Sequence, residues 1–133
     1  MTWQDPVAMI RAALAAHDPV LETTRVLEPR FIEGPLPVVH VHHRGGVLDE
    51  YDRTDQVTLD VYALTPTAEE AEAGVLGAGG LAAELMGVLV PGPLYTQAGT
   101  VDETSCSAPV TRPYHQDVEV ASMVLDVVHR PTH

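Results

Sequence analysis

The chain has 133 residues and a formal net charge of −12, because 19 Asp and Glu residues stand against 7 basic residues, all of them Arg. This balance excludes a domain that grips nucleic acid by its phosphates, since such a surface needs aligned cations, although DNA could pass beside an acidic wall without sticking. Cys106 is the single cysteine, which excludes an internal disulfide and a thiolate metal cluster. We expect one soluble domain over residues 1–133, made in a cytoplasm, because neither a signal peptide nor a membrane-spanning stretch is evident.

The first part of the chain predicts a helix and then a strand. Asp5 is a candidate N-cap with Pro6 at the first helical position, and the helix should end near Asp18-Pro19. The residues of its predicted apolar face are Val7, Ile10, Ala13, Leu14 and His17. Leu36–Arg44 alternates in polarity and predicts a strand, and Gly45-Gly46 predicts the turn of an antiparallel hairpin. The segment from Val47 to Arg53 is either a loop or the start of the next strand.

The centre of the chain predicts a half-buried strand followed by one long helix. Gln56–Ala63 alternates with a period of two, which is the pattern of such a strand. Thr67 is a candidate N-cap for a helix over Glu69–Val90, which Pro91 would end. Its apolar stripe is predicted from Ala71, Val75, Ala78, Ala82, Leu85 and Leu89. Glycines within this pattern fit close packing, or a break near Gly79-Gly80.

The last part of the chain predicts strands. Ala108–Tyr114 contains two prolines, so it belongs to a sheet edge or a loop, and Gln116–His129 alternates as one long strand. The predicted order is helix, strand, strand, long helix, strand, strand. We therefore predict an α+β fold: a mostly antiparallel sheet of about four strands, with the long helix and the N-terminal helix packed on one face.

The run His40-Val41-His42-His43 is the strongest hint of a metal site. His40 and His42 point to the same side of a strand, and their spacing from Gly34 resembles the first half of a cupin metal motif. The glutamate that this motif needs a few residues later is missing, since Gly46 or Val47 stands there. A solvated face of histidines on an edge strand is therefore the preferred interpretation, with no metal and no cofactor.

Other clusters give no catalytic prediction. Asp49, Glu50, Asp52 and Asp55 lack the glycine and the final glutamate of an EF-hand loop, which favours a solvated acidic loop. The glycines between 74 and 80 follow no strand directly and precede no Lys, so they do not form a phosphate-binding loop. Ser105-Cys106-Ser107 offers nucleophiles, but the sequence pairs them with no base. We do not expect an enzyme.

Four segments together resemble the tail terminator proteins of long-tailed phages, also called tail completion proteins, particularly those from actinobacterial hosts. The segments are the opening helix Asp5–His17, the strand Gln56–Ala63, the helix Glu69–Val90 and the closing stretch Val110–Val128. Within the last, Thr111-Arg112-Pro113 precedes Asp117 and an alternating strand, which is typical of the family's ending. The resemblance covers most of the chain and rests on layout, since the family has no invariant catalytic motif.

The resemblance implies a structural virion protein, assembled in the host cytoplasm and located where the tail meets the neck. Such a protein forms a ring, expected to be a hexamer, on the last ring of the tail tube. The ring stops polymerisation of the major tail tube protein and joins the head connector protein, while DNA passes through its lumen without specific binding. No membrane is involved.

A ring built head to tail needs two different patches on each subunit. The predicted interface residues are Arg44 and Arg53 beside the hairpin, and Arg112 and Tyr114 before the last strand, because cations on so acidic a protein suit a neighbour's carboxylates. Three alternatives stay open: another head–tail connector or neck protein, a small metal-binding protein or enzyme that uses His40 and His42, and a small-molecule or peptide binding domain.

Overall fold

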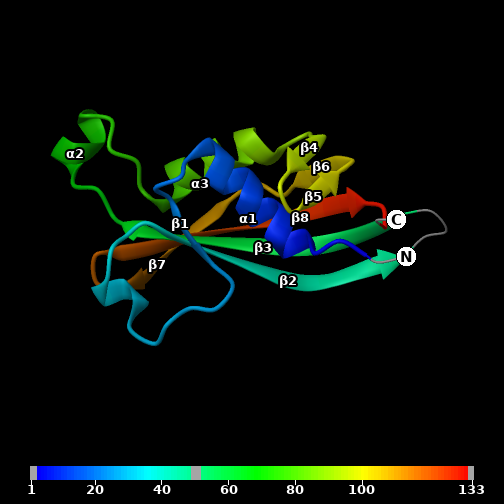
Figure 1. Ribbon diagram of the computed structural model, residues 1–133. Coiled ribbons are helices and arrows are strands. Elements are labelled where there is room, and N and C mark those ends of the chain that lie inside the picture. The colour runs from blue at the N-terminus through cyan, green and yellow to red at the C-terminus, as the bar shows by residue number, and fades with distance from the viewer. Residues whose placement is uncertain (1–2, 49–51, 132–133) are drawn as a thin grey trace.

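A computed structural model describes residues 3–48 and 52–131 (Figure 1). The helices are α1 (Pro6–His17), a 3-10 turn η1 (Phe31–Glu33), α2 (Ala68–Glu72) and α3 (Ala78–Leu89). The strands are β1 (Glu22–Thr24), β2 (Val38–Leu48), β3 (Arg53–Leu64), β4 (Leu94–Thr96), β5 (Gly99–Val101), β6 (Glu103–Cys106), β7 (Val110–His115) and β8 (Val118–His129).

Three long strands, β2, β3 and β8, form the centre of a six-stranded sheet in the order β1-β2-β3-β8-β6, and β7 also pairs with β8. All pairs are antiparallel except β1 with β2. The short strands β4 and β5 form a separate hairpin. The predicted α+β class is confirmed, with more strands than the four expected, because three-residue β1 and the polar β6 carry too little alternation to be recognised.

The main core lies between one face of the sheet and the helices α1 and α3, which both lie on that side in Figure 1. Odd-numbered residues of β2 and β3 point into it, as the period of a strand requires, together with odd-numbered residues of β8. The buried sheet residues are Val39, Val41, Val57, Leu59, Val61, Ala63, Ala121, Met123, Leu125 and Val127. Val7, Ile10 and Leu14 of α1 face them as predicted.

The first helix begins as predicted. The Asp5 carboxylate accepts hydrogen bonds from the backbone N–H groups of Val7 and Ala8, at 3.1 and 3.2 Å, and Pro6 occupies the first turn. His17 does not join the apolar face, because it lies exposed beside Glu84 at the end of the helix. No helix in the described part of the chain is long and apolar enough to cross a membrane.

The prediction of one long helix over Glu69–Val90 is wrong. The segment folds as α2 and α3, separated by residues 73–77, so the break comes before Gly79-Gly80. Gly74 has a φ of +88°, a left-handed conformation that glycine adopts readily and that ends α2. As a result Ala78, Ala82, Leu85 and Leu89 are buried on the sheet, whereas Ala71 and Val75 from the predicted stripe are exposed.

The β2–β3 hairpin is confirmed, but its predicted turn at Gly45-Gly46 is wrong. Both glycines lie within β2, where the register shifts by a bulge between His43 and Gly45. A Cβ atom on Gly46 would come within 2.2 Å of the Asp55 Oδ1 atom, so the glycine allows this close approach. Of the predicted solvated acidic loop, Asp49 and Glu50 lie outside the described residues. The prediction is wrong for Asp55, which is buried within β3.

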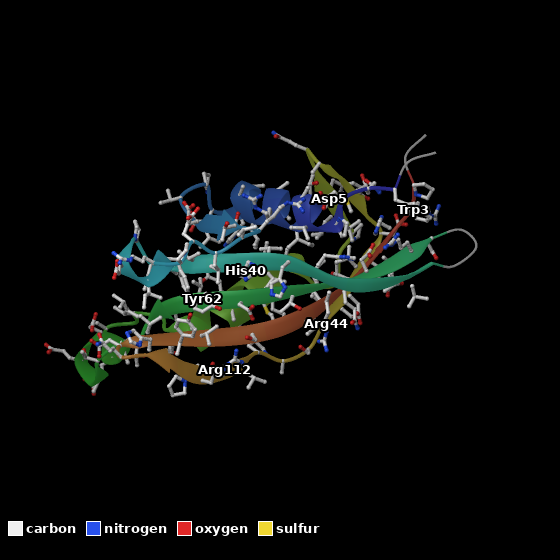
Figure 2. The ribbon with its side chains drawn as sticks, turned by 90° about the horizontal axis from the view of Figure 1, so that it is seen from below. Trp3, Asp5, His40, Arg44, Tyr62 and Arg112 are labelled. Carbon is white, nitrogen blue, oxygen red and sulfur yellow. The ribbon has the colours of Figure 1, made fainter. Side chains whose placement is uncertain are left out.

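The opposite side of the sheet is called the open face here, and Figure 2 views it directly. At one end the segment 27–36 crosses it, and Phe31 packs edge-on against Tyr62 with ring centroids 4.7 Å apart. Towards the middle the face is polar and partly exposed, with His40 labelled on β2. β7 lies at the sheet edge, as predicted from its prolines: Pro109 precedes the strand and Pro113 lies within it.

Candidate functional site

Two clusters of polar side chains lie on opposite faces of the three central strands. The Asp55 cluster contains His43, Arg53, Asp55 and His129, and it closes one end of the helix-covered core. The Asp60 cluster contains His40, His42, Asp60 and Ser122, and it lies on the open face. Asp55 and Asp60 belong to the same strand, and their odd and even positions send their side chains to opposite faces.

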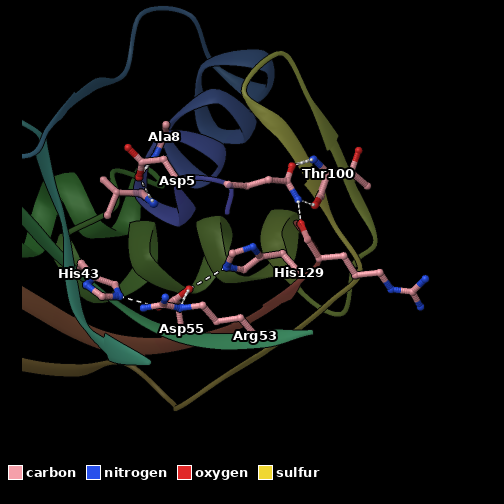
Figure 3. A network of polar contacts seen from close by, with 10 residues as sticks. Asp5, Ala8, His43, Arg53, Asp55, Thr100 and His129 are labelled. Atoms are coloured by element: carbon pink, nitrogen blue, oxygen red, sulfur yellow. Dashed lines mark hydrogen bonds and ion pairs between the residues drawn. The ribbon is translucent and has the colours of Figure 1, made fainter. Parts of the chain in front are cut away.

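The carboxylate of Asp55 is surrounded by nitrogen atoms from three strands (Figure 3). Its Oδ1 lies 2.6 Å from Nε2 of His43, and its Oδ2 lies 2.7 Å from Nε2 of His129. The Nε of Arg53 lies 3.1 Å from Oδ1 and 3.0 Å from Oδ2. Asp55 is 1% exposed and His129 is fully buried, so this cluster is part of the core.

The surroundings of Asp55 favour its ionised form. Burial alone would raise the pKa of this carboxyl, but hydrogen bonds from His129, His43 and Arg53, together with the charge of Arg53, hold the pKa below its ordinary value. Asp55 is therefore a carboxylate at neutral pH. Within the described residues, the Nδ1 atom of His129 has no hydrogen-bond partner, so the hydrogen bond of this ring runs from Nε2 to Asp55.

Trp3 and Gln4, which precede α1, pack beside this cluster. Trp3 packs edge-on against His129 with ring centroids 5.8 Å apart. The Gln4 side chain donates to the carbonyls of Thr100 and Arg130, at 3.0 and 2.7 Å, and accepts from the Thr100 N–H at 2.8 Å. These contacts hold Trp3 and Gln4, which precede α1, beside the end of β8 (Figure 1).

The Asp60 cluster is arranged in a row by strand register. His40 is paired with Asp60 between β2 and β3, and Asp60 is paired with Ser122 between β3 and β8. The Ser122 hydroxyl donates to Oδ1 of Asp60 at 2.6 Å, and Nε2 of His42 lies 2.9 Å from Oδ2. The rings of His40 and His42 stack with centroids 4.3 Å apart. Both imidazoles therefore face one carboxylate on a partly exposed surface.

The segment Ser105-Cys106-Ser107 has a structural role. Burial and the nearby charge of Asp126 raise the pKa of the Cys106 thiol, so it stays protonated at neutral pH and is a weak nucleophile. The Ser107 hydroxyl accepts the backbone N–H of Val124 at 2.9 Å and so continues the pairing of β6 with β8. These contacts give the segment no activated nucleophile.

The four predicted interface residues lie in different settings. Arg44 is exposed at the bulge of β2, and Arg112 is exposed on β7, on the other side of the β3–β8 pair (Figure 2). Arg53 is half-buried against Asp55. Tyr114 is 48% exposed, and its ring packs against Tyr62 with centroids 5.0 Å apart. Arg44 and Arg112 therefore present separate cationic points on the sheet.

Sequence analysis missed the roles of Asp55, Asp60, Ser122 and His129. For Asp55 and His129 a signal was present, because each continues the odd-numbered apolar row of its strand towards the core. For Asp60 and Ser122 the signal lies in the pairing of strands that are far apart in the chain, and a single sequence does not contain that register.

Comparison with models of protein families gives no match, and comparison with curated proteins gives none either. Comparison with solved structures gives a chain of the virion of a native gene transfer agent particle. The two chains are 16% identical, the match covers 92% of each, and the TM-score is 0.61. The present chain therefore has the same fold as a chain of that particle over nearly its full length.

Proposed function

We propose that this chain is a structural protein of a phage-like virion and has no enzymatic activity. The observation that carries the proposal is the shared fold with a chain of a gene transfer agent virion, which extends over 92% of both chains. Matching over the whole length favours a comparable building block over a shared small motif. The inert setting of Cys106 and the structural use of Ser107 agree with this role.

Within the virion, the role we propose is that of a tail terminator. Copies of the chain form a ring, expected to be a hexamer, that caps the tail tube, ends its polymerisation and joins it to the head connector. The support is the resemblance of the opening helix, the central strand and the closing stretch to that family. The net charge of −12 also suits a lumen through which DNA slides without binding.

The subunit contacts of this ring are proposed to involve Arg44 and Arg112. A head-to-tail ring joins two different patches of each subunit. Arg44 on β2 and Arg112 on β7 are exposed on strands that flank the β3–β8 pair on opposite sides, as two such patches require. Tyr114 is exposed two residues after Arg112 on β7 and belongs to the same proposed patch. Arg53 acts indirectly, because its ion pair with Asp55 supports the β2–β3 hairpin.

Light scattering on the purified chain, alone and with the cognate tail tube protein, tests this proposal. We expect a ring of defined mass, either in the free protein or on the end of tubes. Arg44→Glu and Arg112→Glu should each weaken ring formation, because each places a carboxylate against acidic neighbours. Arg30→Glu is the matched control, since Arg30 is exposed but lies in the segment between β1 and β2.

A monomer that ignores the tube protein contradicts the tail terminator role. If such a monomer binds the cognate head connector instead, the role becomes that of another neck protein. If the two interface variants and the Arg30 variant assemble equally well, the proposed contacts are wrong while the ring itself stands.

A further inference from the structure

Three side chains able to bind a metal ion meet on the open face. His40 and His42 project from β2, and Asp60 projects from the neighbouring β3. Each of these three residues offers one ligand atom, and the three atoms lie within 4.8 Å of one another. We propose that His40, His42 and Asp60 form a binding site for one divalent transition-metal ion of the Zn²⁺ type. The site lies within one chain, so it is independent of the proposed ring.

The distances from the Asp60 oxygen to the two histidine nitrogens are close to those around a tetrahedral ion. Nδ1 of His40 and Nε2 of His42 lie 3.9 and 2.9 Å from Oδ2 of Asp60. Zinc binds histidine nitrogen and carboxylate oxygen at about 2.0–2.2 Å, which places neighbouring ligand atoms roughly 3.4 Å apart in a tetrahedron. Each of these two distances differs from this value by about 0.5 Å. The ligand atoms of His40 and His42 lie within 4.8 Å of each other.

The proton of His40 is held on the nitrogen that faces away from the site. Its Nε2 lies 2.9 Å from the carbonyl oxygen of Arg25, which can only accept a hydrogen bond. Nε2 therefore carries the proton, and Nδ1 presents its lone pair towards Asp60. A histidine that ligates a metal commonly donates its other N–H to a carbonyl in this way.

Asp60 is also oriented by a hydrogen bond from a residue outside the ligand set. Ser122 on β8 donates to Oδ1 at 2.6 Å, which leaves Oδ2 directed at the two imidazoles. The register of β2, β3 and β8 fixes these groups on the most extensively paired strands of the sheet. The ligand set is thus preorganised by backbone pairing and by hydrogen bonds outside the set.

The donor atoms select the class of metal. Two imidazole nitrogens and one carboxylate oxygen suit Zn²⁺ and its neighbours in the transition series, whereas Ca²⁺ and Mg²⁺ prefer oxygen atoms alone. The side chains of His40, His42 and Asp60 are 19%, 36% and 16% exposed, so an ion can enter from solvent. With three protein ligands, water takes the fourth position of the ion.

Titration calorimetry with ZnCl₂, on the full chain made without a histidine tag, tests the site. We expect saturable binding of one Zn²⁺ per chain and none of Mg²⁺. His42→Ala and Asp60→Asn should each abolish binding, and Ser122→Ala should weaken it by about 10- to 100-fold. His115→Ala is the control, because this exposed histidine on β7 lies outside the set, and its variant should bind as the unaltered chain does.

Absorption spectroscopy with Co²⁺ adds a measurement that needs no variant. Tetrahedral coordination by the unaltered chain should give intense visible bands, which an excess of Zn²⁺ should remove. The proposal is overturned if the unaltered chain shows no saturable binding, if binding persists in folded His42→Ala and Asp60→Asn chains, or if His115→Ala loses binding to the same extent. It is also overturned if Co²⁺ gives only the weak spectrum of the hydrated ion.

Discussion

Asp55 and Asp60 lie on the same strand, yet the sheet gives them different tasks. Asp55 is 1% exposed, and the nitrogens of His43, Arg53 and His129 occupy both of its oxygens. Asp60 lies on the open face, where Ser122 donates to one oxygen and His42 lies 2.9 Å from the other, with Nδ1 of His40 at 3.9 Å. We therefore expect the buried Asp55 to matter mainly for stability, and the partly exposed Asp60 to matter mainly for the proposed metal site.

The largest expected effect comes from removing the buried carboxylate. Asp55→Ala should lower the free energy of unfolding by about 3 kcal/mol, because Arg53 and two histidines lose their buried acceptor. The matched change on the open face, Asp60→Ala, should cost about 1 kcal/mol. Urea unfolding followed by circular dichroism measures both, and equal losses would contradict the distinction drawn between the two clusters.

A second test of the buried Asp55 cluster adds a methyl group beside it. Gly46→Ala should destabilise the chain by about 1–3 kcal/mol, because the new Cβ atom would lie 2.2 Å from Oδ1 of Asp55. Gly87→Ala is the control on α3, where a Cβ atom meets no described atom within 4 Å, and it should stabilise the helix by about 0.5–1 kcal/mol. If Gly46→Ala leaves the thermal unfolding temperature unchanged, the hairpin can move away from Asp55 and the expected clash does not form.

Acid should affect the buried cluster through the lowered pKa of Asp55. A carboxyl whose folded-state pKa is lower contributes stability that is present above its unfolded pKa and is lost as the pH falls through the folded pKa. We therefore expect the unfolding free energy to fall below about pH 4. Asp55→Asn should flatten this decline in denaturant titrations across pH. If Asp55→Asn leaves the decline of the unfolding free energy at low pH unchanged, other carboxyls cause that decline.

The smallest expected effect lies on the open face. Ser122→Ala removes one hydrogen bond to Asp60 and should cost about 1 kcal/mol or less, because water can replace the hydroxyl there. Its effect on Zn²⁺ affinity should be larger than its effect on stability. A variant that loses stability but keeps the same Zn²⁺ affinity would show that Ser122 supports the strands and does not orient the proposed ligand.

Much of this fold could be predicted from local patterns. The cap at Asp5, the alternation in Gln56–Ala63 and the alternation in the last strand depend only on neighbouring residues, and each is confirmed. The single long helix is wrong because the apolar spacing continues across Gly74, where a positive φ ends the helix. Likewise Gly45-Gly46 has the composition of a turn, but the contact of Gly46 with Asp55 gives it a place inside β2.

The candidate sites were harder to predict because they depend on long-range register. The pair His40 and His42 is visible as a spacing, but the third group, Asp60, joins it only through the pairing of β2 with β3. His129 reaches Asp55 from the far end of the chain for the same reason. The role of Arg44, Arg112 and Tyr114 as subunit contacts rests on their exposed positions and on the charge of the two arginines, and it stays a prediction until assembly is measured.

The most direct test of the central claim is the length of tail tubes assembled in the presence of this chain. The cognate major tail tube protein is polymerised with and without it, and tube lengths are measured by negative-stain electron microscopy. We expect shorter tubes, each with an extra ring at one end, at less than one copy of the chain per tube subunit. Tubes of unchanged length that carry no added ring, in the presence of a folded chain in excess, would contradict the proposed role.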